Sequence, residues 1–421
     1  MEGGTSHEPG PFLRSAPGPG RGGTPMNLDD LRFLRSDRGR EVLEALAGED
    51  LAPGRELALL GRLRRTLAPA EAAAALSQAR LRLRARGKFP EAERLFLLPE
   101  ALEQATARPL ALHRAEWLHR HAPGGPVLDL GAGLGGDTLA LARFRPVVAW
   151  EADPLRRELL AANLEELGLA DRVEVRGEDW TRAELPEAGA AYADPSRREG
   201  GRRRQGLAEM DPPLERVLAV RARVPALAVK VAPGIPDGAV PAGASVEFVG
   251  VAGECREAVL WFGPLAGPPR RASVWKDDRW EELVSGGEPP PEGPLEPGCI
   301  LYEPEPAVLR AGALAELCAR LDAWLFDRHL AWLVADRPRP DALVSAFEIQ
   351  EVHHFGLKRL QERLAALGVA RVEIKKRGFA MEPEELRRRL RLPREGRDGV
   401  VLLTRRGDEP LFLIARRLRP A

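Results

Sequence analysis

A glycine-rich segment that joins a short apolar run to a polar helix start constrains the fold of this chain most. It reads VLDLGAGLGGDT over residues 127–138. Gly131, Gly133 and Gly136 satisfy the spacing GxGxxG, whereas Gly131, Gly133 and Gly135 satisfy GxGxG. A strand that runs through such glycines into a helix lets a ligand approach the backbone at the helix N-terminus. The spacing leaves a dinucleotide and an adenosyl ligand open, and a glycine-rich turn without a ligand is the structural alternative.

The sequence after residue 126 supports an α/β fold around this segment. Short apolar runs alternate with helical segments, and they read PVLDL, PVVAWE, RVEVRGED, AAYADP and LAVKVAP. This alternation predicts a Rossmann-like domain over 122–284, with a mostly parallel sheet covered by helices. The runs ASVEFVGVAG and EAVLWFG follow one another with little helical sequence between them, so they predict an antiparallel edge of that sheet.

Composition divides the rest of the chain. Residues 1–25 are rich in Gly, Pro and Arg and predict a disordered tail. Dense Ala, Leu, Glu and Arg over 26–121 predict several amphipathic helices. The Pro/Gly stretch 285–298 predicts a linker. Beyond it, alternating helical and strand-like segments predict a small α+β module, which we divide into 299–345 and 346–421.

Acidic residues follow the predicted strands at positions that suit a cationic ligand with a ribose. Asp129 lies two residues before the first glycine, where a dinucleotide fold usually has an apolar residue because the pyrophosphate is anionic. Glu151 ends the next strand and can accept hydrogen bonds from ribose hydroxyls. Asp179 follows the third strand and can accept a hydrogen bond from an adenine amine. The carboxylate before the glycines favours a ligand with a cationic amino-acid end.

This order of elements resembles class I S-adenosylmethionine-dependent methyltransferases, which have an acidic residue before GxGxG and acidic residues after the second and third strands. The resemblance implies S-adenosyl-L-methionine as the cofactor. It also implies that the first acidic residue and the glycines contact the methionine end, and that the other two acidic residues contact the ribose and the adenine. The expected cofactor-binding residues are Asp129, Gly131, Gly133, Gly135, Asp137, Glu151 and Asp179.

The predicted fourth strand ends at Asp194 and Pro195, on the side of the sheet where such folds bind ligands. In base-methylating members of the family, an Asp/Asn-Pro-Pro-aromatic motif there holds the target amine and stacks on the flipped base. Asp194 and Pro195 match this motif, whereas Ser196 and Arg197 do not. We expect Asp194 and Pro195 to form the catalytic end, with Lys230 at the end of the fifth strand as a partner of Asp194 or as a cation on the acceptor side. A strand-end cap is the structural alternative for Asp194.

The order of motifs resembles one group more closely, namely bacterial methyltransferase-like proteins with a THUMP-like C-terminal domain. The similar segments are EQATARPLALHRAEWL, LDLGAGLGGDTLALA, ADPSRR, VKVAPG, LYEPEPAVLRAG, KKRG and IARR. The resemblance covers residues 27–421. It implies a helical N-terminal region, a Rossmann-like domain with a seven-stranded, mostly parallel sheet, a ferredoxin-like segment over 299–345 and a THUMP-like module over 346–421.

The C-terminal module is the expected RNA-binding part, because true THUMP domains bind RNA. Residues 371–421 contain 15 Lys and Arg against 8 Asp and Glu, although the whole chain has 63 of each and no net charge. This local surplus has the sign that nucleic acid requires. A solvated charged surface is the alternative. The candidate RNA contacts are Lys375, Lys376 and Arg377, then Arg387, Arg388, Arg389 and Arg391, and Arg197 and Arg198 beside the predicted active site.

Other features exclude several classes of protein. Cys255, Cys299 and Cys318 lie far apart, so we expect neither a disulfide framework nor a metal site. No apolar run has the length of a membrane helix, and the first residues lack a signal-peptide core. We therefore expect a cytoplasmic methyltransferase that acts on RNA. A small-molecule or protein acceptor, and a non-catalytic RNA-binding protein with a nucleoside-binding Rossmann-like domain, are the alternatives.

Overall fold

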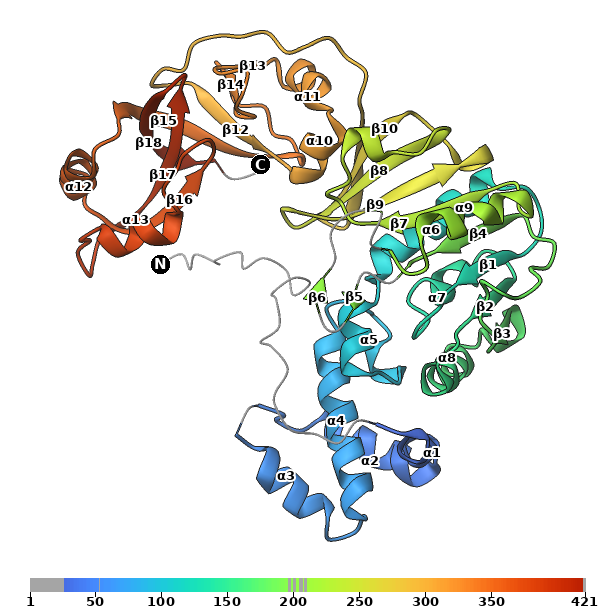
Figure 1. Cartoon of the computed structure of the whole chain (residues 1–421). Coiled ribbons are helices and arrows are strands. Elements are labelled where there is room, and N and C mark those ends of the chain that lie inside the picture. The colour runs from blue at the N-terminus through green and yellow to red at the C-terminus, as the bar shows by residue number, and fades with distance from the viewer. Residues whose placement is uncertain are drawn as a thin grey trace. The chain divides into compact units, whose positions relative to one another are not determined.

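The computed structural model describes residues 26–52, 54–195, 198–199, 202–203, 207 and 210–418. They belong to two compact units of the chain shown in Figure 1. The first unit consists of Met1–Val231, Pro241–Ala244 and Leu260–Gly267. The second unit consists of Ala232–Val240, Ser245–Val259 and Pro268–Ala421. The helical N-terminal region and the strands around the glycine segment therefore share one unit.

Helices form the N-terminal part of the first unit, as the sequence predicted. The Asn27 side chain accepts hydrogen bonds from the amides of Asp29 and Asp30 and so caps the first helix. Proline occupies the first turn of α4, α5 and α6, where its missing amide costs no hydrogen bond within the helix. The helices are α1 (Leu28–Arg35), α2 (Asp37–Ala47), α3 (Glu56–Leu63), α4 (Pro69–Ala85), α5 (Pro99–Gln104) and α6 (Arg108–His121).

Five parallel strands of the first unit carry the glycine segment and have the order β3-β2-β1-β4-β7. They are β1 (Val127–Leu130), β2 (Val147–Trp150), β3 (Val173–Arg176), β4 (Ala190–Ala193) and β7 (Leu227–Val231). Every residue of β1, β2, β4 and β7 is buried, which explains their continuous apolar sequences. Asp129 in β1 and Lys230 in β7 are the charged exceptions in these four strands.

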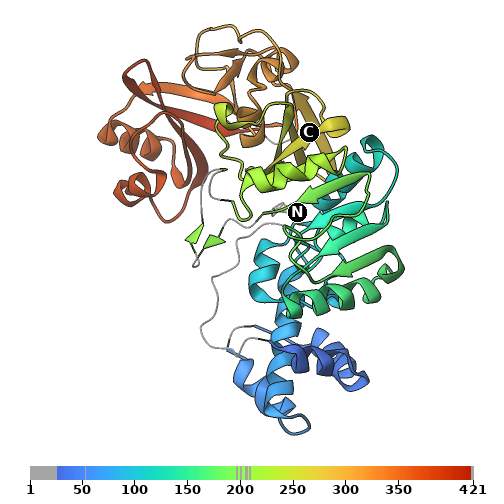
Figure 2. The ribbon, with the colours of Figure 1, turned by 45° about the vertical axis from the view of Figure 1, so that its right-hand side comes forward.

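Helices cover both faces of these parallel strands (Figure 2). They are α7 (Thr138–Leu141), α8 (Pro154–Glu166) and α9 (Leu214–Leu218). Across the sheet, the chain advances in one direction from β1 through α7 to β2 and through α8 to β3. From β4 through α9 to β7 it advances across the sheet in the opposite direction. Right-handed connections therefore place α7 and α8 on one face and α9 on the other. The change of direction puts the ends of β1 and β4 beside each other, at the position where such sheets bind ligands.

The sheet has nine strands, two more than the seven predicted. The remaining strands are β8 (Ala244–Val251), β9 (Glu254–Phe262), β10 (Arg270–Lys276) and β11 (Arg279–Val284), in the order β11-β10-β8-β9-β7. The predicted edge pair, β8 and β9, is therefore not the edge. The sequence prediction missed the β10–β11 hairpin because its turn, Asp277-Asp278, contains no glycine. Both residues nevertheless have positive φ, 50° and 56°, as a two-residue hairpin turn requires.

The second unit also contains a seven-stranded sheet with the order β13-β14-β12-β15-β18-β17-β16. Its strands are β12 (Ile300–Pro304), β13 (Trp324–Leu325), β14 (Leu333–Ala335), β15 (Val344–His354), β16 (Val369–Lys376), β17 (Arg397–Arg406) and β18 (Glu409–Arg417). Its helices are α10 (Pro306–Ala311), α11 (Leu314–Leu321), α12 (Leu357–Ala366) and α13 (Pro383–Arg389). The residues expected to form a ferredoxin-like segment and a THUMP-like module thus contribute strands to one sheet.

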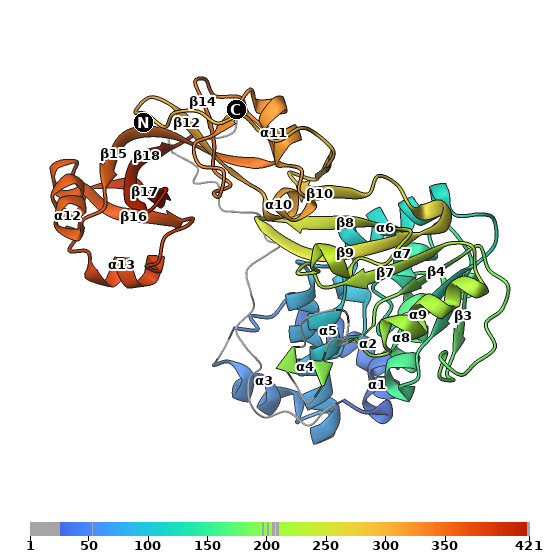
Figure 3. The same ribbon diagram turned by 45° about the horizontal axis from the view of Figure 1, so that its top comes forward.

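Apolar clusters cover both faces of this second sheet. On one face, Leu402 of β17 packs in a cluster with Trp332 and Phe347. On the other face, Leu403 packs in a cluster with side chains of α12 and α13, which lie on the same side of β16 and β17 (Figure 3). The described residues 285–298, predicted as a linker, form neither a helix nor a strand and belong to this unit.

Candidate active site

The glycine segment folds beside the end of β2, where the amide of Gly131 donates to the carbonyl of Trp150 at 3.2 Å. Gly131, Gly133 and Gly135 all have positive φ, at 99°, 58° and 90°, which other residues adopt only with strain. A Cβ atom added to Gly131 or Gly133 would meet no atom within 4 Å. One added to Gly135 would lie 2.6 Å from a methyl carbon of Leu160. Gly131 and Gly133 therefore border open space that a ligand can use, whereas Gly135 permits close packing against α8.

Asp129 places a carboxyl group inside β1, with 1% of its surface exposed. Its Oδ2 accepts a hydrogen bond from Thr138 Oγ1 at 2.5 Å. Burial raises the pKa of Asp129 to about 7; the Thr138 hydrogen bond opposes this rise, and the charges of Asp137 and Asp194 add to it. Because the pKa of Asp129 is higher in the folded chain than in the unfolded chain, the free energy of unfolding falls as the pH rises from the unfolded-state pKa to the folded-state pKa. A cation beside Asp129 would favour its ionised form.

Glu151 ties the end of β2 to the glycine segment. Its carboxylate accepts hydrogen bonds from the amides of Gly133 at 2.8 Å and Asp153 at 2.9 Å. Asp179 lies three residues after β3 and is exposed. Its Oδ1 accepts hydrogen bonds from the hydroxyl and amide of Thr181 at 2.8 and 2.9 Å, and these bonds lower the pKa of Asp179. Glu151 thus contacts the glycine segment directly, whereas the contacts of Asp179 are local.

Asp137 follows the glycines, and donors from this chain surround its carboxylate. The hydroxyl of Thr106 donates to it at 2.9 Å, the hydroxyl of Tyr192 donates at 3.2 Å, and Arg114 forms an ion pair with it. The Arg114 guanidinium also lies 4.8 Å from the centre of the Tyr192 ring. These contacts hold the end of the glycine segment in place. Thr106, Arg114 and Tyr192 were not predicted from the sequence, although the first two lie in the segment EQATARPLALHRAEWL, which carries part of the family resemblance.

Lys230 and Asp194 form an ion pair at the neighbouring ends of β7 and β4. The Nζ atom of Lys230 donates to Asp194 Oδ2 at 2.5 Å and to Thr106 Oγ1 at 3.1 Å. The Lys230 side chain is 6% exposed, whereas that of Asp194 is 29% exposed. Pro195 is buried directly after Asp194. The structure therefore brings Asp194 and Lys230 together, with the carboxylate as the end of the pair that solvent or a substrate can reach.

The three basic residues first expected to contact RNA are engaged within the second unit. Lys375 forms an ion pair with Glu303, and Lys376 forms one with Glu382 at 2.5 Å. The Arg377 guanidinium lies 5.2 Å from the centre of an indole ring, and burial lowers its pKa. RNA would have to compete with these partners. Counting charges along the sequence does not detect such pairing.

Other arginines of this region are more accessible. Arg388, Arg391 and Arg394 are exposed, and no ion pair is found for their side chains among the residues that the structure describes. Gln361 of α12 holds the backbone of this loop, because its Oε1 accepts from the Arg391 amide at 2.7 Å. Arg389 pairs with Glu385 one turn earlier on α13. We call Arg388, Arg391 and Arg394 the α13 arginine surface.

The arginine-rich loop after Asp194 is described in part. Arg197 lies outside the described residues. Arg198 begins the two-residue strand β5 (Arg198–Glu199), which pairs antiparallel with β6 (Arg202–Arg203). This hairpin follows the strand end that carries Asp194.

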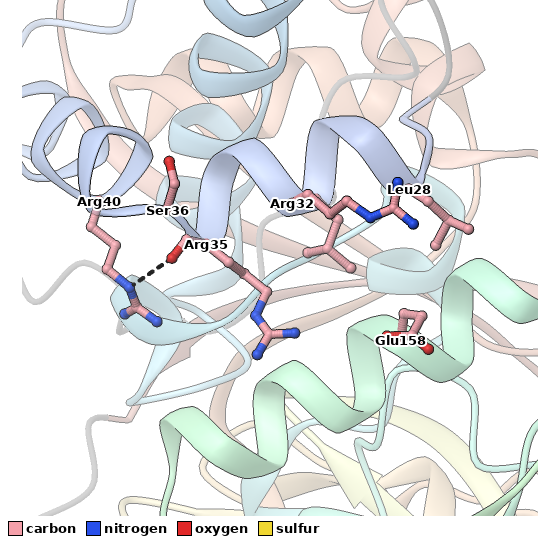
Figure 4. A pocket seen from close by; sticks show the side chains of 7 residues that line it. Leu28, Arg32, Arg35, Ser36, Arg40 and Glu158 are labelled. Carbon is pink, nitrogen blue, oxygen red and sulfur yellow. Dashed lines mark hydrogen bonds between the residues drawn. The ribbon is translucent and has the colours of Figure 1, made fainter.

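A separate cavity of about 500 Å³ lies in the first unit between α1, α2 and α8 (Figure 4). Arg35 and Arg40 at this cavity form ion pairs with Glu165 and Glu166 of α8. These carboxylates offset the positive charge, so we assign the cavity to the packing of the helices. Its lining residues are Leu28, Leu31, Arg32, Arg35, Ser36, Arg40 and Glu158.

In the part of the chain that the structure describes, no cluster of His, Cys, Asp and Glu could hold a metal ion. The cysteines Cys255, Cys299 and Cys318 are free thiols. No helix in these residues has the length and apolar character needed to cross a membrane.

Comparison with known proteins identifies the family. Residues 344–417 match the family model "THUMP domain-like", and residues 27–85 match a domain of unknown function, DUF8688. Two relatives are 35% identical over 343 residues, a match that covers 78% of this chain and 91% of each relative. They are the uncharacterized S-adenosylmethionine-dependent methyltransferases MT3122 and Rv3037c of Mycobacterium tuberculosis strains CDC 1551 and H37Rv.

A solved structure supports the fold. The crystal structure of a "putative methyltransferase" from Porphyromonas gingivalis W83 has a TM-score of 0.67 at 19% identity, covering 94% of this chain and 100% of that chain. The predicted α/β fold, the enzyme class and the cofactor, S-adenosyl-L-methionine, are thereby confirmed. On the evidence of its relatives, this chain belongs to the S-adenosylmethionine-dependent methyltransferases.

Proposed function

We propose that this enzyme methylates RNA, that transfer takes place at the ends of β4 and β7, and that residues 346–421 contact the RNA. The observation that carries the choice of RNA is the exposed α13 arginine surface within the region that matches the THUMP domain-like model. Guanidinium groups without ion-pair partners are suited to phosphate. A cytoplasmic location is part of the same proposal, supported by the three free cysteines.

We assign the donor site to the carboxyl ends of β1, β2 and β3. The open space at Gly131 and Gly133 fits a ligand that approaches the backbone closely. The buried carboxyl of Asp129 suits the cationic amino-acid end, and Glu151 suits the ribose hydroxyls. Asp179 remains our candidate for the adenine amine: its side chain is exposed, and the amine would share its Oδ2 with Arg182, whose Nε lies 3.6 Å away. When bound, S-adenosyl-L-methionine supplies a methyl group that its sulfonium already activates.

At the acceptor side, we assign orientation of the substrate to Asp194. Its partly exposed carboxylate can accept a hydrogen bond from an N–H or O–H group of the acceptor and hold it toward the donor site. Lys230 fixes the other side of this carboxylate through the 2.5 Å ion pair. Buried Pro195 has a fixed φ and restricts the backbone of Asp194 before it. The residues Arg197 and Arg198 remain candidates for phosphate contacts beside this site.

The RNA contact is tested by removing the α13 arginine surface. Changing Arg388, Arg391 and Arg394 together to Gln is expected to weaken RNA binding about tenfold or more at low salt. The slope of log affinity against log salt concentration should also become shallower, because fewer counterions are released. Binding is measured by fluorescence anisotropy over a salt series. A matched control changes the exposed Arg64, Arg65 and Arg94 of the first unit to Gln, which removes the same charge; equal losses in both variants would contradict a specific contact.

Labelling of cell fractions tests the acceptor itself. The full chain is incubated with methyl-labelled S-adenosyl-L-methionine and with total RNA, protein or small molecules, each purified from a cell extract. We expect label in the RNA fraction, reduced in the variant without the α13 arginine surface. Label confined to the protein or small-molecule fraction would contradict an RNA acceptor.

A further inference from the structure

We propose that Thr106 is a positioning residue that links the glycine segment to the acceptor side. The helical N-terminal region would then supply part of the transfer site. The inference rests on the proposed function in that it places methyl transfer at Asp194, although it does not require the acceptor to be RNA.

The hydrogen bonds of Thr106 have a fixed direction. Its hydroxyl lies 3.1 Å from Lys230 Nζ and 2.9 Å from Asp137 Oδ2, and the residue is 6% exposed. An ammonium group only donates, so the Thr106 oxygen accepts from Lys230 and its own proton points to Asp137. Lys230 also donates to Asp194. A continuous chain of polar contacts therefore runs from Asp194 through Lys230 and Thr106 to Asp137.

The backbone around Thr106 is anchored against the glycine segment. Lys88 Nζ donates to the carbonyls of Leu102 at 2.7 Å and Ala105 at 3.0 Å, at the end of α5. A Cβ atom on Gly136 would lie 3.3 Å from the Thr106 amide nitrogen, which is tighter than most such contacts. The glycine at 136 thus permits this close approach. Thr106 is held in place by contacts on both sides and is not part of a free loop.

This placement allows Thr106 to orient the Lys230–Asp194 pair. Lys230 is buried, so the acceptors of its Nζ atom determine where the ammonium points. The ammonium in turn determines which way the partly exposed Asp194 carboxylate faces the acceptor. Loss of the hydroxyl would remove one acceptor from Lys230 and one donor from Asp137 together. Lys230 on the acceptor side and Asp137 in the glycine segment would then each lose a hydrogen bond, which the methyl group of a valine at position 106 cannot form.

The kinetic test compares Thr106→Val, which keeps the shape but not the hydroxyl, with Thr106→Ser, which keeps the hydroxyl. For Thr106→Val we expect kcat for methyl transfer to fall about 10- to 100-fold, while affinity for S-adenosylhomocysteine changes less than about threefold. Thr106→Ser is expected to restore most of the rate. Wild-type kcat in Thr106→Val, or a loss that Thr106→Ser does not rescue, would overturn the inference.

A second measurement needs no acceptor. The chain has six lysines, so lysine labelled with ¹³C at Cε gives few NMR signals, and the loss of one in Lys230→Met assigns Lys230. Thr106→Val is expected to shift the Lys230 signal. In Thr106→Ser the Lys230 signal should stay near its wild-type position, and the signal of Lys358, an exposed lysine of the second unit, should not move in either variant. An unmoved Lys230 signal in Thr106→Val would overturn the inference. If the wild type labels protein or small molecules instead of RNA, the RNA proposal fails. The positioning role of Thr106 is then still tested by this spectrum and by kcat with the acceptor that was labelled.

Discussion

Asp194→Asn is expected to lower the rate of methyl transfer about 100-fold or more, within the range typical of a lost acid-base group. Asn has the same size and its amide oxygen can still accept from Lys230, so the ends of β4 and β7 should remain folded. It lacks the negative charge, however, and its amide hydrogens would face the acceptor where a carboxylate oxygen stood. The rate is measured in single turnovers with labelled donor.

The controls for Asp194→Asn separate transfer from binding. Affinity for S-adenosylhomocysteine, measured by calorimetry, should stay within about threefold of the wild type, since Asp194 lies outside the assigned donor site. Asp171→Asn, at an exposed position before β3, removes the same charge and should leave the transfer rate unchanged. Undiminished transfer by Asp194→Asn would remove Asp194 from the chemistry.

Arg114→Met is expected to lower the free energy of unfolding by about 3 kcal/mol or more, because it leaves one partner of a buried ion pair without its charge partner. The side chains of Arg114 and Asp137 are 3% and 12% exposed. The variant also removes the guanidinium that lies over the Tyr192 ring. Thr106 and Tyr192 still donate to Asp137, and these bonds limit the loss. Denaturant unfolding followed by tryptophan fluorescence measures it.

A matched control exists on the same helix. Arg120 pairs with Glu116 one turn earlier, but the two side chains are 63% and 46% exposed. Exposed pairs contribute little, so Arg120→Met should change the free energy of unfolding by less than about 1 kcal/mol. Equal effects of Arg114→Met and Arg120→Met would show that burial of the Arg114–Asp137 pair is not important for stability.

The sequence predicted the parts of the site that depend on local pattern. Continuous apolar runs identified the buried parallel strands, and the glycines identified the close turn after β1. Asp129 and Lys230 stood out because each is a charge within such a run. Asp194 was a candidate because it ends a strand at the edge where such folds bind ligands. For these residues, the neighbours in the chain supply the reason for the expected role.

The parts that the sequence did not predict depend on tertiary contacts. Thr106, between α5 and α6, and Arg114 of α6 reach Asp137 from 31 and 23 residues upstream, and no pattern within their segment shows that they meet this carboxylate. The surplus of basic residues pointed to Lys375 and Lys376 of β16. The partner of Lys375, Glu303, comes from β12, and the partner of Lys376, Glu382, lies at the start of α13. Net charge therefore located the basic region but did not separate its paired side chains from exposed ones such as Arg388 and Arg391.

In the proposed donor site, carboxyl groups at the ends of these strands hold the ammonium of the donor. A calorimetric titration of S-adenosylhomocysteine, which keeps this ammonium, tests the claim at pH 6 and pH 8. Burial raises the pKa of Asp129 to about 7, so binding of the ligand's ammonium must expel a proton at pH 6 but not at pH 8. We predict about tenfold tighter binding at pH 8 for the wild type, and weaker binding without this pH dependence for Asp129→Asn. Equal affinity and equal pH dependence in the two proteins would contradict the claim.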